Sequence, residues 1–558
     1  MASLQFARAA DLMAGRLFGG GRMKTRVWAA GLAAAIALAM GGAAMAAGVN
    51  PAPPRKPGEG LGPFHTLIIH GATLIDGTGA PPNGPVDIVI HDNIIAEIRE
   101  AARPGHVGDA AKGLPPADHV IDATGQYVLP GFIDMHTHGG TPDKAPDLTY
   151  VYKLWMAHGV TTVRSVPLVF DNNALVANEK ARSARNEIVA PRIFNYTTPC
   201  SSWTGGPCNT PEQGRAWVRW AAKNNIDGVK FFNFDPPEVM AAMLDEAKKQ
   251  HLGSVAHLSQ PGVARMNALQ AGRLGLGTVT HYYGHFESIL KGHQIQSFPT
   301  DYNYANEEDR FGEAAAIWDQ TYEPGSKEWW DYLKEQKANH VDFDPTFTIY
   351  SAGRDLMRAR NADWHPIYTL PSLWAFYQPS HEHHGSFFFD WTTEREVTWK
   401  RFYQRYMQLI HDYQSIGGRV TTGSDSGFIY NLYGFGYIQE LELLQEAGLT
   451  PLEVVRSATL NGAMTLYDPK GETPPMGEVT VGKLADLVIV PENPLANFKV
   501  LYGTGRLKLD EKTGKAAMIG GVRFTIKDGI VYDAKALLAD VAAMVAAQKN
   551  QGTGGAAK

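Results

Sequence analysis

The chain has 558 residues, of which 44% are hydrophobic and 19% charged, as in ordinary globular enzymes. This length allows one large domain with a smaller one, or several modest domains. The net charge of -6 and the lack of a long basic run argue against a nucleic-acid partner.

The N-terminus has the features of a targeting segment. Basic residues within 22–26 precede an apolar run at 28–40, and Ala44-Met45-Ala46 offers a small-x-small cleavage site. The apolar run is too short for a membrane anchor, so we expect no stable membrane span after cleavage.

We therefore predict a signal peptide at 1–46, with Met23 as an alternative start, and a Pro-Gly-rich linker at 47–64. The mature protein is expected to be exported, to the periplasm or beyond the cell.

Short strands are expected near both ends of the chain. They alternate with turns from about 65 to 129. The same pattern of short strands and turns is found again after 467, as in 485–490 and 522–527. This pattern predicts one β-sandwich domain composed of 65–129 and 467–537, followed by a C-terminal helix and flexible tail at 538–558.

The middle, 130–466, alternates apolar strands with amphipathic helices such as 237–250, the pattern of parallel βα units. Eight strands are expected, the number of a (β/α)8 TIM barrel, whose chemistry lies at the C-terminal strand ends. They are 128–135, 160–166, 192–196, 228–232, 254–257, 278–281, 341–348 and 419–422.

Two connections in this barrel, 282–339 and 350–417, are too long for ordinary βα loops and are rich in aromatic residues. Their aromatic side chains either line an apolar cleft or form helical padding with its own small core.

The sequence has two cysteines, Cys200 and Cys208, in a segment rich in Gly and Pro. In an exported protein such a close pair predicts a disulfide. A metal site is less favoured because no second pair completes a thiolate set.

The first barrel strand leads into His136-Thr137-His138. Residues two apart on a strand point the same way, so both imidazoles can serve one metal ion. A His-x-His match alone also fits two surface or core histidines.

Four further strands end in, or lead into, potential ligands. These residues are Lys230, His257, His281 and Asp425. A lysine inside a barrel would be a costly unpaired charge. Carboxylation by CO2 would turn it into an anionic ligand able to bridge two cations, whereas the alternative is a salt-bridged or lid-facing lysine.

Several segments resemble the amidohydrolase superfamily, within its imidazolonepropionase-like and metal-dependent prolidase-like hydrolases. The signatures are Leu129–His138, His158–Arg164, Leu449–Ala463 and Gly482–Leu487, and the resemblance spans about 65–535.

The resemblance implies a binuclear site, usually of zinc. His136, His138 and Asp425 would hold the buried metal, His257 and His281 the outer one, and carbamylated Lys230 with a hydroxide would bridge them. The bridging hydroxide would attack the substrate, with Asp425 as general base and acid.

At some positions this sequence departs from the patterns of particular family members, which argues against the activities of those members. Gly140 stands where dihydroorotases carry arginine, and Lys230 argues against mononuclear deaminases and true imidazolonepropionase. Tyr282, His285 and Trp203 are candidate substrate contacts, with a structural role equally open for His285.

We expect hydrolysis of an amide or peptide bond in a small molecule, either a dipeptide, including Xaa-Pro, or an N-acyl amino acid. An esterase, lactonase or xenobiotic amide or carbamate hydrolase is the first alternative. A catalytically inactive binding barrel is the second, and homo-oligomerisation is left open.

Overall fold

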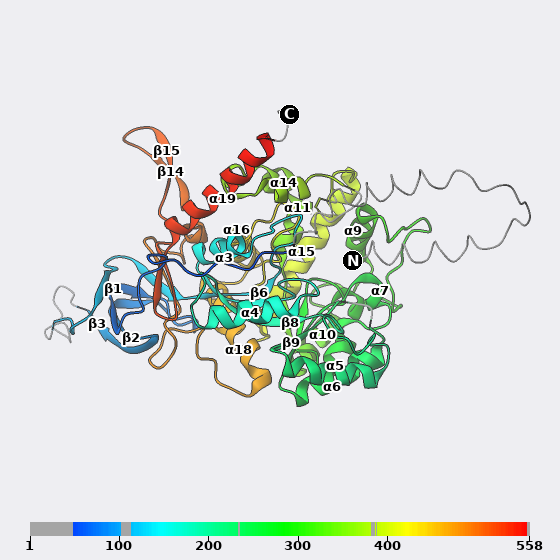
Figure 1. Cartoon of the computed structure of the whole chain (residues 1–558). Coiled ribbons are helices and arrows are strands. Elements are labelled where there is room, and N and C mark those ends of the chain that lie inside the picture. The colour runs from blue at the N-terminus through cyan, green and yellow to red at the C-terminus, as the bar shows by residue number, and fades with distance from the viewer. Residues whose placement is uncertain (1–47, 102–112, 233–234, 381–384, 387, 555–558) are drawn as a thin grey trace, which may run out of the picture. The chain divides into compact units, whose positions relative to one another are not determined.

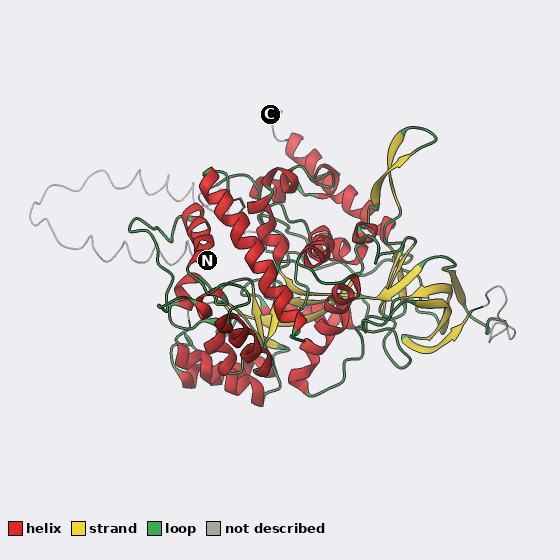
Figure 2. Ribbon diagram, turned by 180° about the vertical axis from the view of Figure 1, so that it is seen from behind, coloured by secondary structure: helices red, strands yellow, loops and turns green. Residues whose placement is uncertain are grey.

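A barrel of parallel strands forms the centre of the computed structural model, which describes residues 48–101, 113–232, 235–380, 385–386 and 388–554. Strands lie inside a layer of helices (Figures 1 and 2), and seven of them are joined in sequence order. They are β6 (Phe132–Thr137), β7 (Val160–Ser165), β8 (Arg192–Thr197), β9 (Gly228–Phe231), β10 (Gly253–His257), β11 (Thr278–Thr280) and β12 (Asp342–Asp344).

Residues 419–425 close the barrel between β12 and β6 as its eighth segment. The backbone N–H of Phe343 donates to Arg419 at 3.0 Å, and that of Thr421 donates back to Phe343 at 2.9 Å. On the other side, Met135 donates to Thr422, and Asp425 donates to His136, both at 2.9 Å. The fold is therefore α/β, with the expected barrel, although the eighth segment pairs too briefly to form a regular strand.

The prediction was wrong for two strands. Residues 128–135 form two strands, β5 (Tyr127–Pro130) and β6, and β5 belongs to a different sheet. The predicted strand 341–348 ends at Asp344, and a helix begins at Phe347. Apolar runs of this length do not reveal where a strand changes sheet or gives way to a buried helix.

Helices surround the barrel and close one end of it. The connecting helices are α3 (Leu148–Ala157), α4 (Asn173–Ala184), α5 (Pro211–Lys223), α6 (Pro237–Lys249), α7 (Gln260–Val263), α8 (Ala268–Arg273) and α16 (Phe435–Glu446). After them come α17 (Pro451–Arg456), a π-helical turn (Ser457–Asn461), α18 (Gly462–Tyr467) and a 3-10 turn (Asp468–Lys470).

Side chains from α18 pack into the barrel interior. Ala463 and Leu466 share one buried cluster with Ile133, Met135 and other strand residues. These apolar side chains fill a part of the barrel interior at the end that α18 covers.

Strands from both chain ends form the second sheet, called the sheet domain below. It contains β1 (Thr66–Leu74), β2 (Asn83–His91), β3 (Ile94–Glu100), β4 (His119–Asp122), β5, β13 (Leu487–Val490), β16 (Phe524–Lys527) and β17 (Ile530–Asp533). Antiparallel pairing of β5 with β13, Leu129 opposite Val488, joins the two halves of the sequence. A hairpin of β14 (Arg506–Asp510) and β15 (Lys515–Ile519) stands apart, preceded by a 3-10 turn (Phe498–Leu501).

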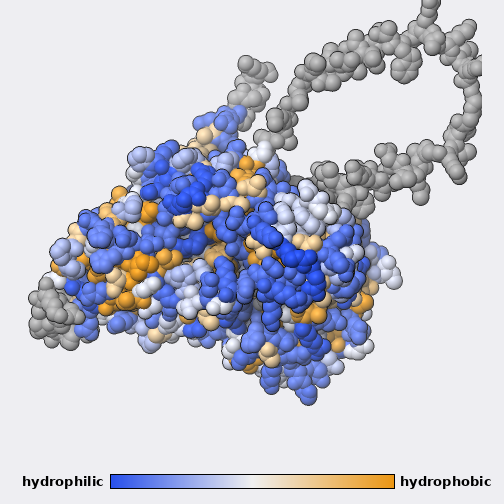
Figure 3. Space-filling view, turned by 60° about the horizontal axis from the view of Figure 1, so that its bottom comes forward, coloured by the Kyte–Doolittle hydropathy of each residue, from blue (hydrophilic) through white to orange (hydrophobic). Residues whose placement is uncertain are grey.

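Hydrophobic residues gather on one side of the face drawn in Figure 3, toward the sheet domain, and the rest of this face is mainly hydrophilic. Exposed hydrophobic side chains of the sheet domain include Ile94 on β3 and Val120 on β4.

Helices fill both aromatic insertions. The first contains a 3-10 turn (Phe286–Ile289), α9 (Glu307–Ala315), a second turn (Ala316–Asp319) and α10 (Lys327–Ala338). The second contains α11 (Phe347–Arg354), α12 (Leu356–Arg360), α13 (His365–Tyr368), α14 (Pro371–Phe376) and α15 (Thr393–Ser415). Trp329, Trp399, Tyr403 and Tyr406 are fully buried among them. Much of the aromatic content is therefore helical padding, as in the second alternative, but it shares one core with the barrel instead of forming its own.

The segment before β1 is held to the body by backbone hydrogen bonds, as from Asn50 to Pro146 at 2.7 Å and from Arg55 to Glu187 at 2.7 Å. The C-terminal helix α19 begins at Ala534, a few residues before the predicted boundary. No helix of the described residues is long and apolar enough to cross a membrane. The predicted signal peptide lies outside the described residues.

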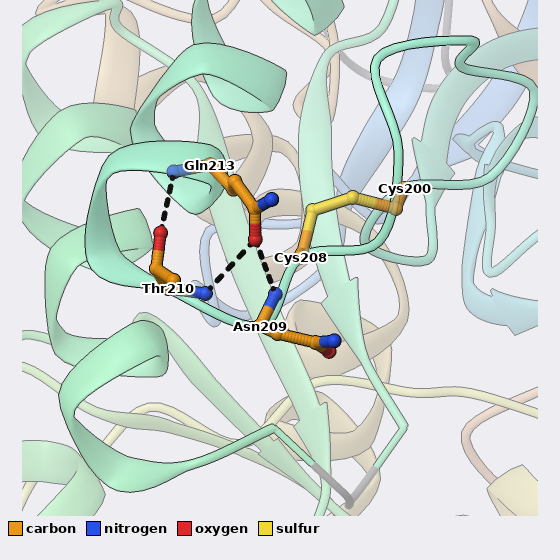
Figure 4. The surroundings of a disulfide bond; sticks show 5 residues. All are labelled: Cys200, Cys208, Asn209, Thr210 and Gln213. Carbon is orange, nitrogen blue, oxygen red and sulfur yellow. Dashed lines mark hydrogen bonds between the residues drawn. A yellow bond between two sulfur atoms is a disulfide. The ribbon is translucent and has the colours of Figure 1, made fainter.

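Cys200 and Cys208 form a disulfide, with Cα atoms 5.9 Å apart, in the loop after β8 (Figure 4). The loop leads into α5 through a capping box, in which Thr210 accepts from the Gln213 N–H and the Gln213 side chain accepts from the Thr210 N–H. The bond and the cap together fix the path of this loop beside the barrel rim.

Close packing around Tyr196 inside the barrel yields a stability prediction. A Cβ on Gly253 would overlap the Tyr196 hydroxyl, and one on Gly228 would overlap its ring. Gly253→Ala should therefore lower the free energy of unfolding by about 1–3 kcal/mol, the usual cost of overpacking. Urea unfolding checks this value, with Gly48→Ala as the control because no atom lies within 4 Å of its added Cβ. Equal stability of both variants would contradict the packing described.

Candidate metal centre

Predicted ligands from separate strands converge at one rim of the barrel. His136, His281 and Asp425 each offer a ligand atom, and these atoms lie within 4.8 Å of one another. Asp425 Oδ1 lies 3.4 Å from His138 Nε2 and 3.8 Å from His136 Nε2, and its Oδ2 lies 3.8 Å from His281 Nε2. One carboxylate thus faces three imidazoles.

His257 and Lys230 complete the cluster. The ring of His257 lies 4.7 Å from that of His281, measured between centroids. Lys230 is fully buried on β9, and its charge acts on His136, His138 and His281. All six predicted ligands therefore belong to one group of side chains.

The three histidines around Asp425 direct Nε2 inward and use Nδ1 for outward hydrogen bonds. His138 Nδ1 lies 3.2 Å from the Pro167 carbonyl, which requires a proton on Nδ1 and leaves the Nε2 lone pair free. His136 Nδ1 lies 2.8 Å from Thr280 Oγ1, and His281 Nδ1 lies 2.6 Å from Thr346 Oγ1. Such outward bonds orient metal-binding imidazoles.

Burial keeps these imidazoles neutral. It lowers the pKa of His138 to about 3, with the Lys230 charge as the next cause. It also lowers the pKa of His136 and His281 well below the ordinary value. Neutral imidazoles at pH 7 are the form that binds divalent cations.

Lys230 and Asp425 are pushed toward their neutral forms by the same burial, which lowers the pKa of the lysine and raises that of the aspartate. The Lys230 Nζ is buried without a hydrogen-bond partner among the described residues. Burying an amine without a hydrogen-bond partner is costly. The Lys230 amine is therefore suited to interact with a bound ligand or metal ion. The donor set of four imidazoles, a carboxylate and an available amine fits a pair of divalent cations.

Backbone conformation at the rim is unusual. His281, Thr346 and Asp425 have φ values of 66°, 49° and 48°, in the left-handed region. Non-glycine residues there carry a strain that clusters at functional sites. At His281 and Asp425 this conformation turns the chain directly at the end of a strand segment.

A buried arginine ties the strands together beneath the histidines. Arg164 donates to the Met135 carbonyl at 2.7 Å, to Thr278 Oγ1 at 3.0 Å and to Asp344 Oδ2 at 3.2 Å. Asp344 Oδ2 in turn lies 3.5 Å from Thr280 Oγ1, the hydroxyl that contacts His136. The resulting chain of contacts fixes the orientation of the His136 ring.

The three predicted substrate contacts occupy different environments. Tyr282 is buried among aromatic rings, with Phe402 at 4.8 Å. His285 is fully buried, with Nδ1 2.5 Å from the Tyr332 hydroxyl and its ring 4.3 Å from Phe343, which favours its structural alternative. Trp203 is half-buried on the disulfide loop.

Other aromatic residues contact the histidines, and the sequence did not single them out for this role. Tyr283 lies 4.6 Å from His257, between ring centroids. Phe170 stacks on His138 at 5.7 Å and Phe232 on His257 at 4.7 Å. Both phenylalanines are nearly half exposed, at 46% and 45%. Their place shortly after β7 and β9 was the available signal, since barrel rims are built from such segments.

Comparison with known proteins shows similarity to amidohydrolases. The model of the amidohydrolase family matches residues 406–539. A dihydroorotase of Thermoanaerobacter sp. is 34% identical over 128 residues, covering 22% of this chain and 27% of its own. An N-acyl-D-aspartate deacylase of Alcaligenes xylosoxydans xylosoxydans is 28% identical over 224 residues, covering 39% and 37%. The chain thus spans less than two thirds of the length of these relatives.

Solved structures share the fold over most of the chain. A Xaa-Pro dipeptidase with bound methionine superposes with a TM-score of 0.54 at 19% identity, covering 84% of this chain and all of that one. The ochratoxinase of A. niger gives 0.53 at 15% identity, covering 84% and 96%. Fold and donor set define a barrel of the metal-dependent hydrolase type. The family match over residues 406–539 and this shared fold support a resemblance to the amidohydrolase superfamily.

The outward bond of His136 yields a prediction about metal affinity. Thr280→Val keeps the side-chain shape but removes the hydroxyl at Nδ1, and loss of such support costs about 10- to 100-fold in affinity. Competition with a zinc chelator measures the change. Thr422→Val is the matched control, since its buried hydroxyl has no partner among the described residues. Equal affinities in both variants would exclude the positioning role of Thr280.

Proposed function

We propose that this protein is a metal-dependent hydrolase that cleaves a carbon–nitrogen bond, of the amide or peptide type, in a small molecule. One observation carries the proposal: His136, His138, His281 and Asp425 converge at the barrel rim with Nε2 atoms turned inward. A catalytically inactive barrel would have no need for the complete donor set.

Two divalent cations held here would make a water nucleophilic at neutral pH and polarise the substrate carbonyl. Asp425 would accept the proton of the attacking water through a carboxylate oxygen. Since its pKa is raised by burial, it can then return that proton to the leaving nitrogen. The imidazoles stay neutral because they are buried.

Lys230 is proposed to carry a carboxyl group. Burial lowers the pKa of its amine, so a neutral fraction exists near pH 7. That nitrogen lone pair can add to the carbon of CO2 with release of one proton, giving an anionic carbamate. The product would replace an unpartnered amine by two oxygen donors among the imidazoles.

Dipeptides, including Xaa-Pro, and N-acyl amino acids are the proposed substrates. The similarity to a Xaa-Pro dipeptidase and an N-acyl-D-aspartate deacylase supports this class. So do the exposed rings of Phe170 and Phe232, which can hold an apolar substituent. Those rings also suit the second candidate, a xenobiotic amide or carbamate, and the ochratoxinase and molinate hydrolase structures share the fold.

Export from the cytoplasm is part of the proposal. The Cys200–Cys208 disulfide supports it, because such bonds persist mainly in oxidising compartments.

A screen of the zinc-loaded protein against dipeptides, N-acyl amino acids, lactones and carbamates tests the proposed activity. Release of free amine from the first two classes is expected. Turnover confined to lactones or esters would overturn the C–N assignment.

Asp425→Asn should lower kcat by about 10²- to 10⁴-fold, the usual contribution of general acid–base catalysis, while retaining a large part of the metal. Steady-state kinetics and metal analysis measure the two effects. Asp245→Asn on the surface of α6 is the control and should match the wild type. Wild-type rates in Asp425→Asn would contradict the proposed proton transfer.

Lys230→Met should reduce bound metal from two ions to about one or fewer per chain, because the bridging group of a two-metal site is lost. Elemental analysis gives the metal content. Carbon-13 NMR of protein equilibrated with labelled bicarbonate should show a carbamate signal that is absent from the variant. The surface variant Lys249→Met should retain both properties. Full metal content in Lys230→Met would refute the bridge.

A further inference from the structure

Lys144, in the loop after β6, is a buried lysine that the proposed chemistry does not use. Its side chain is 4% exposed, and its backbone belongs to a tight turn in which Lys144 N and Ala145 N both donate to the Thr141 carbonyl. Ser372 Oγ donates to the Lys144 carbonyl at 2.6 Å and fixes the turn from another side.

Two aromatic rings surround the Lys144 ammonium. Nζ lies 3.6 Å from the centre of the Phe428 ring and 4.7 Å from that of Phe376. Its hydrogen bond, to the Gly427 carbonyl, is long at 3.4 Å. An ammonium has three donors, so the group retains unused hydrogen-bonding capacity.

This ammonium borders the metal centre. Gly427 lies two residues after Asp425, and the Phe428 ring lies 5.9 Å from that of His138. The Lys144 charge also acts on Asp425 and His138. Lys144 therefore stands on the side of the centre formed by His138 and Asp425.

Asp143 and Asp425 act on this charge, but no carboxylate oxygen of the described residues lies within 4.0 Å of Nζ. A buried cation without an anion in direct contact is unfavourable, and burial lowers the pKa of Lys144 to about 8, which leaves it mainly charged at pH 7. Cation–π contacts offset a part of this cost.

We propose that Lys144 binds the free carboxylate of the amino acid that leaves during hydrolysis, an inference that rests on the proposed function. Asp425 protonates the leaving nitrogen, and in an amino acid one carbon separates that nitrogen from the carboxylate. The leaving carboxylate consequently lies beside Asp425, where the Lys144 ammonium stands. This subsite selects N-acyl amino acids and dipeptides over uncharged amides, esters and carbamates.

A binding experiment on the metal-loaded full chain tests the subsite without turnover. The probes are L-phenylalanine and L-phenylalaninol, which have the same ring and amine but differ in the carboxylate, and neither has an amide bond. Isothermal titration should show a preference for phenylalanine of about tenfold or more, typical of one charge-assisted hydrogen bond.

Lys144→Met should reduce that preference to within about threefold, since the side chain keeps its length and apolar contacts but loses its charge. Lys144→Arg should retain most of it. The control is Lys470→Met, because the Lys470 ammonium also lies over two rings, those of Phe194 and Tyr467, at 5.0 Å each. Metal content and thermal unfolding are measured for every variant.

The proposal is overturned if Lys144→Met retains the preference, if Lys144→Arg loses it, or if the wild type shows none. Failure of the proposed function is a separate result. Absence of any hydrolysis together with a preference that depends on Lys144 would refute the activity alone, whereas hydrolysis without that preference would refute the subsite alone.

Discussion

The parallel direction of the barrel strands is the constraint on which the site depends. Strands running the same way end at one rim, so residues distant in sequence, such as His136, Lys230 and Asp425, meet there. The opposite end is filled by apolar side chains of α18. The six predicted ligands meet at this rim, and burial keeps the imidazoles neutral and lowers the pKa of the Lys230 amine.

A second group of residues holds that arrangement in place. Arg164 and Asp344 connect several strands inside the barrel. Thr280, which contacts Asp344, orients the His136 ring through its hydroxyl. Burying an arginine and an aspartate is costly unless both are hydrogen-bonded. Here the pair fixes the direction of a ligand, which is a reason for a barrel to contain charged groups beneath its rim.

The surroundings of the centre combine apolar walls with one cation. Phe170 and Phe232 are exposed beside the histidines, whereas Lys144 is buried between Phe376 and Phe428. Such a combination suits a substrate that has both an apolar part and a negative charge. Uncharged substrates would leave the Lys144 ammonium without a carboxylate in direct contact.

Much of this could be predicted from the sequence, because period-two apolar runs and the residues at their ends depend on local pattern. The barrel, the sheet formed from both chain ends and the grouping of the six donors follow from that pattern. The division of 128–135 into two strands does not, since pairing with β13 decides it. The environments of Lys144 and Tyr283 also depend on segments distant in sequence, such as Phe376 and His257.

The most direct test of the two-metal centre is anomalous diffraction at the zinc edge from crystals of the zinc-loaded protein. Two peaks are expected at the rim, one bound by His136, His138 and Asp425 and the other by His257 and His281, with Lys230 between them. A single peak, or peaks away from these side chains, would contradict the two-metal centre.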